Sequence, residues 1–153
     1  MSGILGTNRV TQVCIIVKDI EESKKKFAEF LGLPVPEHNG GGDYKVTGTE
    51  YMGEPAPEAN SYLAFFDVGP GLQLELIQPN GVASTWQDHL DQHGEGIHHI
   101  AFVVDDMPKS IENCEEFGMK VVQRGKYRDG SGEYTYLDAT DSLKCVIELL
   151  HSY

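Results

Sequence analysis

The sequence has few cysteines and no long hydrophobic run, and both shortages narrow the class of protein. Its three cysteines, Cys14, Cys114 and Cys145, are widely spaced in 153 residues and form no C-x-x-C pair. A zinc ribbon and a thioredoxin-type redox site are therefore excluded, and we interpret the three thiols as reduced core residues. No stretch approaches the roughly 20 apolar residues that span a bilayer, so no membrane association is expected.

Basic residues are also scarce. Twelve lysines and arginines stand against 24 acidic residues, which gives a formal charge of -12. A nucleic acid or an anionic membrane surface would be repelled by this charge, so neither is expected as a partner. The N-terminal segment Met1–Gly6 is too short and too weakly apolar for a secretory signal, and a cytoplasmic location is the expectation. The composition, 40% hydrophobic and 24% charged, is typical of an ordered globular protein.

The chain contains an internal repeat. Residues Gln12–Asp19 and His99–Asp106 are both apolar, β-branched segments that end on an aspartate seven positions after their first residue. Such a segment is typical of a strand, and each aspartate stands where a helix N-cap is expected. Apolar residues at helical spacing follow in both copies, as far as Gly32 in the first and Gly118 in the second. A glycine at that place is typical of a helix C-terminus.

Each copy then continues into strands. Alternating or continuous apolar patterns predict hairpins from Tyr62–Val68 with Leu72–Ile77 and from Tyr134–Asp138 with Leu143–Leu150. A further strand is predicted at Lys120–Gln123. The order of strand, helix and three strands therefore occurs twice, which indicates a duplicated βαβββ module.

These elements predict an α+β fold in which two βαβββ modules form a cleft-shaped mixed β-barrel with flanking helices. The first module is expected at residues 8–80 and the second at 95–153. Residues 81–94 between them form a linking helix and loop, because Ser84 and Gln87 give a capping-box pattern. The stretch Asn39–Asn60 is rich in Gly, Pro and Glu, and we expect a long loop with a short strand at Tyr44–Val46.

Four polar residues interrupt the apolar strands, namely Gln12, Glu75, His99 and Glu148. A polar residue in the middle of a strand usually faces solvent. Here, however, the two glutamates hold corresponding places in the repeat, and a buried carboxylate costs several kcal/mol without a counter-charge. A metal ion bound by all four residues would stabilise both carboxylates at once. His98 faces the other side of a regular strand, so it is expected to pack or to form hydrogen bonds.

The proposed ligands are one imidazole, two carboxylates and one amide oxygen. This mixed set fits one divalent ion, which could be Zn, Ni, Co, Mn or Fe. With water completing an open site, such an ion can polarise a carbonyl group.

Several motifs resemble those of the vicinal oxygen chelate superfamily, also called the glyoxalase/bleomycin resistance/dioxygenase superfamily. They are the repeated βαβββ order, the strand ends Lys18-Asp19 and Asp105-Asp106, the segment Gly96–Phe102 and the terminal Ile147-Glu148-Leu149. The resemblance covers nearly the whole chain. The superfamily includes glyoxalase I, methylmalonyl-CoA epimerase, extradiol dioxygenases and bleomycin-resistance proteins.

Within the superfamily, the sequence shares features with two different enzymes. The region Gly94–Asp106 looks most like methylmalonyl-CoA epimerase, whereas the ligand order Gln, Glu, His, Glu is that of the eukaryotic type of glyoxalase I. Ile16 occupies the position of that enzyme's glutathione-binding arginine. Extradiol dioxygenases carry a histidine where this chain has Gln12, so dioxygenase activity is not expected.

The resemblance implies a metal-dependent epimerase or isomerase, like methylmalonyl-CoA epimerase, that removes and returns a proton next to a carbonyl through a metal-stabilised enediolate. Glu148 and Glu75 would be the acid/base pair. The substrate would be a small carbonyl compound or an acyl thioester, and the family favours a homodimer. A glyoxalase I-like lactoylglutathione lyase and a non-catalytic ligand-binding protein of the bleomycin-resistance kind remain as alternatives.

Basic residues alternate at Arg124, Lys126 and Arg128 in this otherwise acidic chain. Such a pattern usually marks a solvated strand face. It could also contact a carboxylate or a CoA phosphate.

Overall fold

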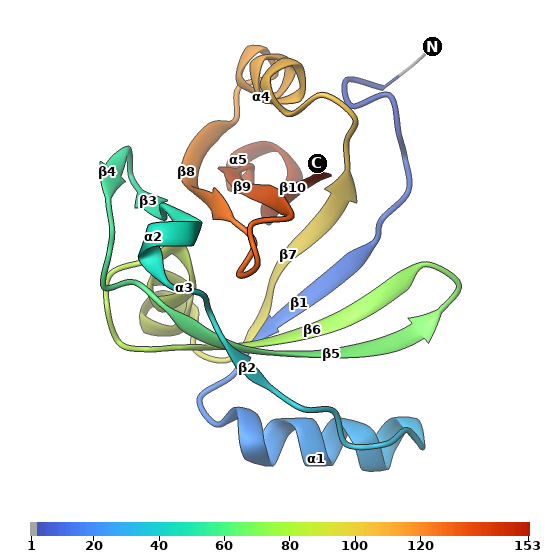
Figure 1. Ribbon diagram of the computed structural model, residues 1–153. Helices are drawn as coiled ribbons and strands as arrows, with labels where there is room; N and C mark the ends of the chain where they lie inside the picture. Colours follow the sequence, from blue (N-terminus) through green and yellow to red (C-terminus); the bar gives the residue numbers. More distant parts are fainter. Residues whose placement is uncertain (1–2) are drawn as a thin grey trace.

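A computed structural model describes residues 3–153. Met1 and Ser2, which begin the N-terminal segment Met1–Gly6 discussed above, lie outside the described residues. Within this range the chain forms an α+β fold with one mixed sheet (Figure 1), which confirms the predicted class. No helix in the described part of the chain is long and apolar enough to cross a membrane. The strands are β1 (Gln12–Ile16), β2 (Asn39–Gly40), β3 (Glu50–Tyr51), β4 (Glu54–Pro55), β5 (Ser61–Gly69), β6 (Leu72–Pro79), β7 (Gly96–Val103), β8 (Lys120–Lys126), β9 (Gly132–Asp138) and β10 (Val146–Ser152).

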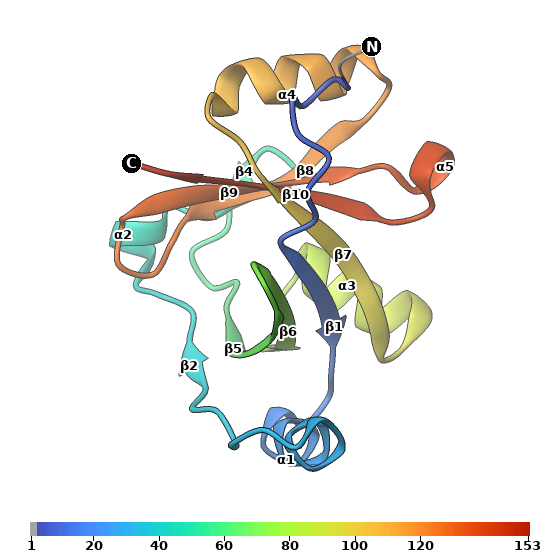
Figure 2. The same ribbon diagram turned by 90° about the vertical axis from the view of Figure 1, so that its right-hand side faces the viewer.

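The sheet is open and strongly curved. Its order is β2-β5-β6-β1-β7-β10-β9-β8-β3-β4, so β1 and β7 lie next to each other at the centre and the two-residue strands β2 and β4 lie at the edges. Figures 1 and 2 show the two halves of the sheet turning around a shared interior without meeting to close a barrel. The result is the cleft-shaped form that the repeat predicts.

The strand register shows the duplication directly. On one side of the centre β1 runs parallel to β6, with Cys14 opposite Glu75. On the other side β7 runs parallel to β10, with Ala101 opposite Glu148. Cys14 lies two residues after Gln12, and Ala101 lies two residues after His99, so the two glutamates occupy equivalent positions. The module boundaries themselves stay a prediction.

Two helices cover the outside of the sheet at opposite ends, α1 (Ile20–Leu31) and α4 (Met107–Glu116) (Figure 2). Each begins at a predicted cap: Asp19 accepts a hydrogen bond from the backbone of Glu22 at 3.0 Å, and Asp106 accepts one from Lys109 at 2.9 Å. Gly32 ends α1 in the left-handed conformation, with φ 67°. This conformation is accessible to glycine at little cost, which explains why the helix stops there.

The linking segment forms helix α3 (Thr85–His93), as expected. The Ser84 hydroxyl accepts a hydrogen bond from the backbone N–H of Gln87 at 3.0 Å, which satisfies one of the free donors of the first turn. The helix packs against β1, β6 and β7 at the centre of the sheet. It therefore closes one side of the interior between the two halves.

Two local predictions are wrong. Tyr44–Val46 is not a strand but part of the one-turn helix α2 (Tyr44–Thr47), because the Asp43 carboxylate caps its first turn and Gly48 ends it in a left-handed conformation. The last strand begins at Val146 rather than Leu143, because another one-turn helix, α5 (Thr140–Leu143), precedes it. In both places the residues form a one-turn helix although their apolar pattern is typical of a strand.

The long insert of the first copy contributes to the second half of the sheet. Its strand β3 pairs with β8, with Glu50 opposite Arg124, and β4 then forms the edge. Its other strand, β2, pairs with β5 in the first half. The insert thus connects the two edges of the open sheet across the cleft.

The three cysteines are free thiols. Cys14 and Cys114 are buried and Cys145 is half-buried against the core of the second half. Their interpretation as reduced core residues fits this placement, most closely for the first two.

Removing either capping aspartate tests whether both caps stabilise the protein equally. We expect Asp19→Ala and Asp106→Ala each to lower the free energy of unfolding by about 1 kcal/mol, the usual cost of a lost N-cap. Urea denaturation measures the change. The matched control is Asp105→Ala, because Asp105 is exposed beside the second cap but does not cap α4. An equal loss in the control would contradict the assignment.

Candidate metal centre

Three of the four predicted ligands meet in the interior. His99 Nε2 lies 2.9 Å from Glu148 Oε2 and 3.4 Å from Glu75 Oε1. His99 is fully buried, and Glu75 and Glu148 are only 6% and 4% exposed. The structure therefore buries the two strand glutamates beside a histidine, as predicted.

The sheet register brings these side chains together. Cys14 on β1 is opposite Glu75 on β6 and also opposite His99 on β7. Directly opposed residues point to the same face of a sheet, so all three side chains lie on the inner face at one level. β10 adds Glu148 from the next strand along.

The atoms at this point fit a metal ion. His99 Nε2, Glu75 Oε1 and Glu148 Oε2 are all buried without a hydrogen-bond partner, even though they lie within ion-pair distance of one another. Buried polar atoms without partners are rare because each loses its hydration free energy. One imidazole nitrogen and two carboxylate oxygens converging on a point form a ligand set for a divalent transition metal ion.

Gln12 lines the same cavity as Glu75 and Glu148. Its side-chain Nε2 donates a hydrogen bond to Gln73 Oε1 at 3.0 Å, and Gln73 is its partner on β6. This bond uses the amide nitrogen of Gln12 and not the oxygen, which is the atom that would bind an ion. Ligation by Gln12 stays a prediction.

His98 does not face the opposite side, as a regular strand would require. The pairing of β7 with β1 goes from His99 opposite Cys14 to Ile97 opposite Ile15, which leaves His98 unpaired in a β-bulge. A bulge turns a side chain away from strict alternation. As a result, His98 is 2% exposed and its Nδ1 lies 2.8 Å from Nδ1 of His99, so it is the hydrogen-bonding residue that was predicted.

Cys14, His98 and His99 form a second group of neighbouring donors. It is less suited to an ion, because the two ring nitrogens on this side are hydrogen-bonded to each other. Burial also raises the pKa of the Cys14 thiol to about 12, which keeps it protonated, and only the thiolate is a good ligand.

Burial perturbs the acid–base properties of the central pair. Desolvation raises the pKa of Glu148 and outweighs the opposite effect of His99. Burial alone would lower the pKa of His99, but the neighbouring Glu148 carboxylate acts in the opposite direction and raises it. Both shifts favour the protonated forms of these two residues when no ion is bound.

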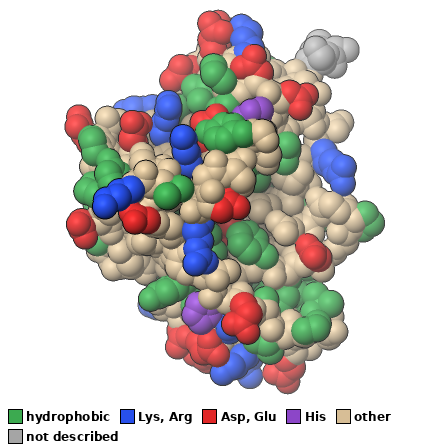
Figure 3. All heavy atoms as spheres, viewed as in Figure 1, with side chains coloured by type: hydrophobic (Ala, Val, Ile, Leu, Met, Phe, Trp, Pro, Cys, Tyr) green, Lys and Arg blue, Asp and Glu red, His purple; other side chains and the backbone are tan. Residues whose placement is uncertain are grey.

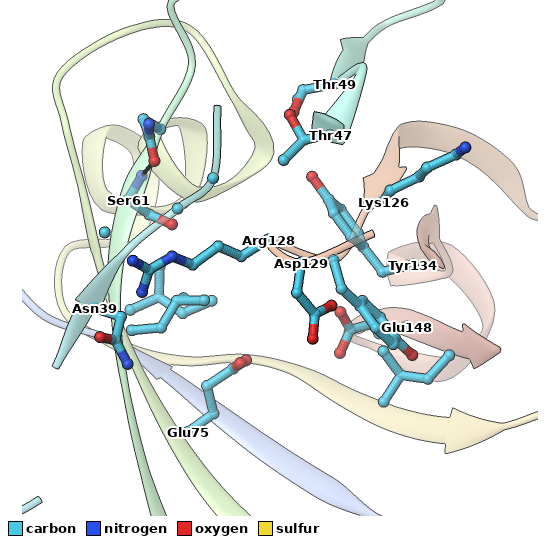
Figure 4. A pocket seen from close by; sticks show the side chains of 18 of the residues that line it. Asn39, Thr47, Thr49, Ser61, Glu75, Lys126, Arg128, Asp129, Tyr134 and Glu148 are labelled. Carbon is cyan, nitrogen blue, oxygen red and sulfur yellow. Dashed lines mark hydrogen bonds between the residues drawn. The ribbon is translucent and has the colours of Figure 1, made fainter. Parts of the chain in front are cut away.

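The site opens into a cavity of about 590 Å³ between the two halves of the sheet. Figure 4 shows Glu75 and Glu148 pointing into it from different strands. Much of its wall is apolar, and the lining includes Leu63, Phe65, Ile77, Val103 and Leu150. This size and character suit a small organic ligand with a few polar groups.

The sequence interpretation missed the aromatic part of this wall. Tyr136 lies opposite Glu148 in the register, and its ring is centred 4.9 Å from that of His99. Its hydroxyl accepts a hydrogen bond from Trp86 Nε1 at 3.0 Å, which ties the wall to α3. The alternation of Tyr134 and Tyr136 on β9 was the available signal, because residues two apart share a face.

The raised pKa values predict that protons compete with metal. A metal ion at His99 Nε2 binds only the deprotonated ring nitrogen, so metal affinity should fall as the pH is lowered from about 8 to about 5. Equilibrium dialysis against Co²⁺ or Zn²⁺ at stepped pH measures this. A metal affinity that stays constant over this range would contradict the assignment of these two residues.

The His98–His99 hydrogen bond should support the metal ligand. If an ion occupies Nε2 of His99, its Nδ1–H donates to Nδ1 of His98, and removal of such a partner weakens metal binding roughly tenfold to a hundredfold. We expect this loss in His98→Ala, measured by metal titration, with the exposed His93→Ala as the control. Equal metal affinity in both variants would show that His98 does not position the ligand.

The chain is similar to known proteins over most of its length. A family model described as the glyoxalase/bleomycin resistance protein/dioxygenase superfamily matches residues 11–136. The curated ethylmalonyl-CoA/methylmalonyl-CoA epimerase of Cereibacter sphaeroides is 26% identical over 144 residues, which are 92% of this chain and 96% of that protein.

Solved structures share the fold. Methylmalonyl-CoA epimerase from Mycobacterium tuberculosis superposes with a TM-score of 0.69 at 17% identity, over 100% of this chain and 92% of that one. A variant of the Streptomyces coelicolor methylmalonyl-CoA epimerase in complex with 2-nitronate-propionyl-CoA superposes with a TM-score of 0.67 at 21% identity, over 94% of this chain and 96% of that one. The match to the family model, which covers most of the chain, shows that this protein belongs to the glyoxalase/bleomycin resistance protein/dioxygenase superfamily.

Proposed function

We propose that this protein is a metal-dependent epimerase that removes a proton from the carbon next to a carbonyl and returns it. The observation that carries the proposal is the pair of buried glutamates. Glu75 and Glu148 hold equivalent positions in the two copies and converge on His99 at the inner end of one cavity. Two carboxylates that approach a reacting carbon from different strands are suited to exchange a proton on its two faces.

Glu148 and Glu75 are the proposed acid/base residues, and His99, Glu75 and Glu148 would hold the ion, with Gln12 as a further candidate ligand. A bound divalent ion would polarise the substrate carbonyl and so acidify the neighbouring C–H bond. The raised pKa of Glu148 brings this carboxyl group closer to the working range of a general acid/base, because desolvation stabilises its protonated form.

The surroundings of the glutamates suit this chemistry. The apolar lining, with Phe65 and Leu63 from β5, limits the access of water to the carboxylates and thereby strengthens electrostatic interactions inside the cavity. The Tyr136 hydroxyl and the Trp86 indole are hydrogen-bonded to each other and keep the wall beside His99 in one arrangement.

An acyl thioester is the proposed substrate class. The curated relative acts, by its name, on ethylmalonyl-CoA and methylmalonyl-CoA, and a structural neighbour was solved with 2-nitronate-propionyl-CoA. Both support an acyl-CoA as the first compound to test. The cavity of about 590 Å³ is large enough for the acyl group and part of the carrier.

A lactoylglutathione lyase is the weaker alternative. Ile16, at the position of the glutathione-binding arginine in the eukaryotic type of glyoxalase I, is fully buried and packs in a core cluster with Cys14 and Trp86. The apolar, buried side chain of Ile16 cannot form an ion pair with glutathione. A ligand-binding protein without catalysis would fill the same cavity and is separated from the epimerase by turnover.

Solvent deuterium uptake tests the proposal. With metal-loaded protein in D₂O, we expect deuterium to enter the carbon between the carbonyl groups of methylmalonyl-CoA, measured by mass spectrometry. Glu148→Gln and Glu75→Gln should each lower the rate by a factor of about 10²–10⁴, the usual contribution of a general acid/base.

The metal content of both variants must be measured with the rate. Gln73→Glu is a control variant, because it changes the charge on the same strand and face as Glu75 without replacing a proposed acid/base residue. Full exchange in both metal-loaded glutamine variants would overturn the acid/base assignment. No exchange in the wild type, together with tight retention of the thioester, would instead favour the ligand-binding protein.

A further inference from the structure

The cavity that Glu75 and Glu148 line also has cationic residues in its wall. Of the three alternating basic residues, Lys126 and Arg128 line the cavity and Arg124 does not. Arg124 instead lies 3.6 Å from Glu50 in an ion pair between β8 and β3. Lys126 places its ammonium group 5.8 Å from the ring centre of Tyr153, a cation–π contact. Two of the three charges therefore have a partner.

Arg128 has no such partner. No carboxylate within residues 3–153 lies within ion-pair distance of its guanidinium. The chain has 24 acidic residues, and Figure 3 shows acidic side chains spread over the whole of this face. Its neighbour Asp129 also lines the cavity, but the Asp129 carboxylate accepts a hydrogen bond from the backbone of Ser131 at 2.9 Å.

The backbone at Arg128 is held in place from two sides. The turn between β8 and β9 is closed by the Gly130 N–H, which donates to the carbonyl of Tyr127 at 2.9 Å. From the other copy, Gly42 approaches so closely that a Cβ there would lie 2.9 Å from Arg128 Cα. Only glycine allows this contact, so the insert of the first copy fixes the position from which Arg128 extends.

The side chain extends into the cavity. Figure 4 shows Arg128 reaching from the β8–β9 turn towards Asn39 and Ser61 on the opposite wall, while Lys126 points away. Asn39 and Ser61 also line the cavity and come from the first half of the sheet. Arg128 is exposed to solvent, so its planar guanidinium with five donors stands at a solvent-accessible part of the cavity, which Glu75, Glu148 and Asp129 also line.

We propose that Arg128 forms an anion subsite that binds a carboxylate or phosphate group of the substrate where the β8–β9 turn meets the cavity. The proposal rests on the epimerase function, because it presumes that the reacting carbonyl occupies the metal end. Guanidinium binds both kinds of oxyanion through paired hydrogen bonds, and an arginine without an acidic partner loses no ion pair when it does so. The substrate would then be a thioester that also carries an anionic group.

Three matched thioesters identify the anion. Propionyl-pantetheine carries no anionic group, methylmalonyl-pantetheine adds a carboxylate, and propionyl-CoA adds phosphates. Their affinities are measured by isothermal titration calorimetry with wild type, Arg128→Gln and the control Arg124→Gln. We expect Arg128→Gln to weaken binding of one anionic thioester at least about tenfold, the typical effect of a lost charged hydrogen bond, and to leave propionyl-pantetheine unchanged.

The pattern of losses decides the outcome. A loss confined to methylmalonyl-pantetheine assigns the subsite to a carboxylate, and a loss confined to propionyl-CoA assigns it to a phosphate. Equal affinities of Arg128→Gln and wild type for all three thioesters, or an equal loss in Arg124→Gln, would overturn the subsite. Arg128→Lys should recover part of the affinity, because charge returns without the paired donors.

The same titrations separate this proposal from the proposed function. If the protein binds thioesters but exchanges no deuterium, the epimerase is wrong, while the selective loss in Arg128→Gln still establishes the anion subsite. If wild type exchanges deuterium and Arg128→Gln binds all three thioesters normally, only the subsite is wrong.

Discussion

The structure depends on the burial of two carboxylates beside one imidazole. Glu75 and Glu148 are held by hydrogen-bonded strands on the inner face of the sheet, and His99 lies between them without hydrogen bonds that satisfy the facing atoms. Burial of two like charges costs several kcal/mol each in the absence of compensation. A divalent cation would provide that compensation, and the equivalent register of the two copies would supply its ligands in pairs.

Much of this could be predicted because the duplication fixes relations between distant residues. The spacing from Gln12 to Asp19 recurs from His99 to Asp106, so the helix caps and the positions of the glutamates follow from one copy to the other. The bulge at His98 could not be predicted, because it depends on the pairing of β7 with β1 rather than on local sequence. The helix at Tyr44–Thr47 was missed because Asp43 and Gly48 outweigh three residues of strand-like pattern.

The insert of the first copy makes the two halves into one site. Its strand β3 extends the second half of the sheet, and β2 extends the first, so the cavity has walls from both copies. The close approach of Gly42 fixes the backbone from which Arg128 extends into the cavity that Glu75 and Glu148 also line. The repeat therefore accounts for the proposed metal site, whereas the features that would select a substrate come from elements in which the copies differ.

The most direct test of the central claim is the stoichiometry of metal binding. Elemental analysis after exhaustive dialysis against limiting Zn²⁺, Co²⁺, Ni²⁺, Mn²⁺ or Fe²⁺ should give one tightly bound ion per chain in the wild type. The double variant Glu75→Gln with Glu148→Gln should bind none, because its amides leave His99 as the one strong ligand in the cluster. A wild type that binds no ion while folded, or a double variant that still binds one equivalent, would contradict the account.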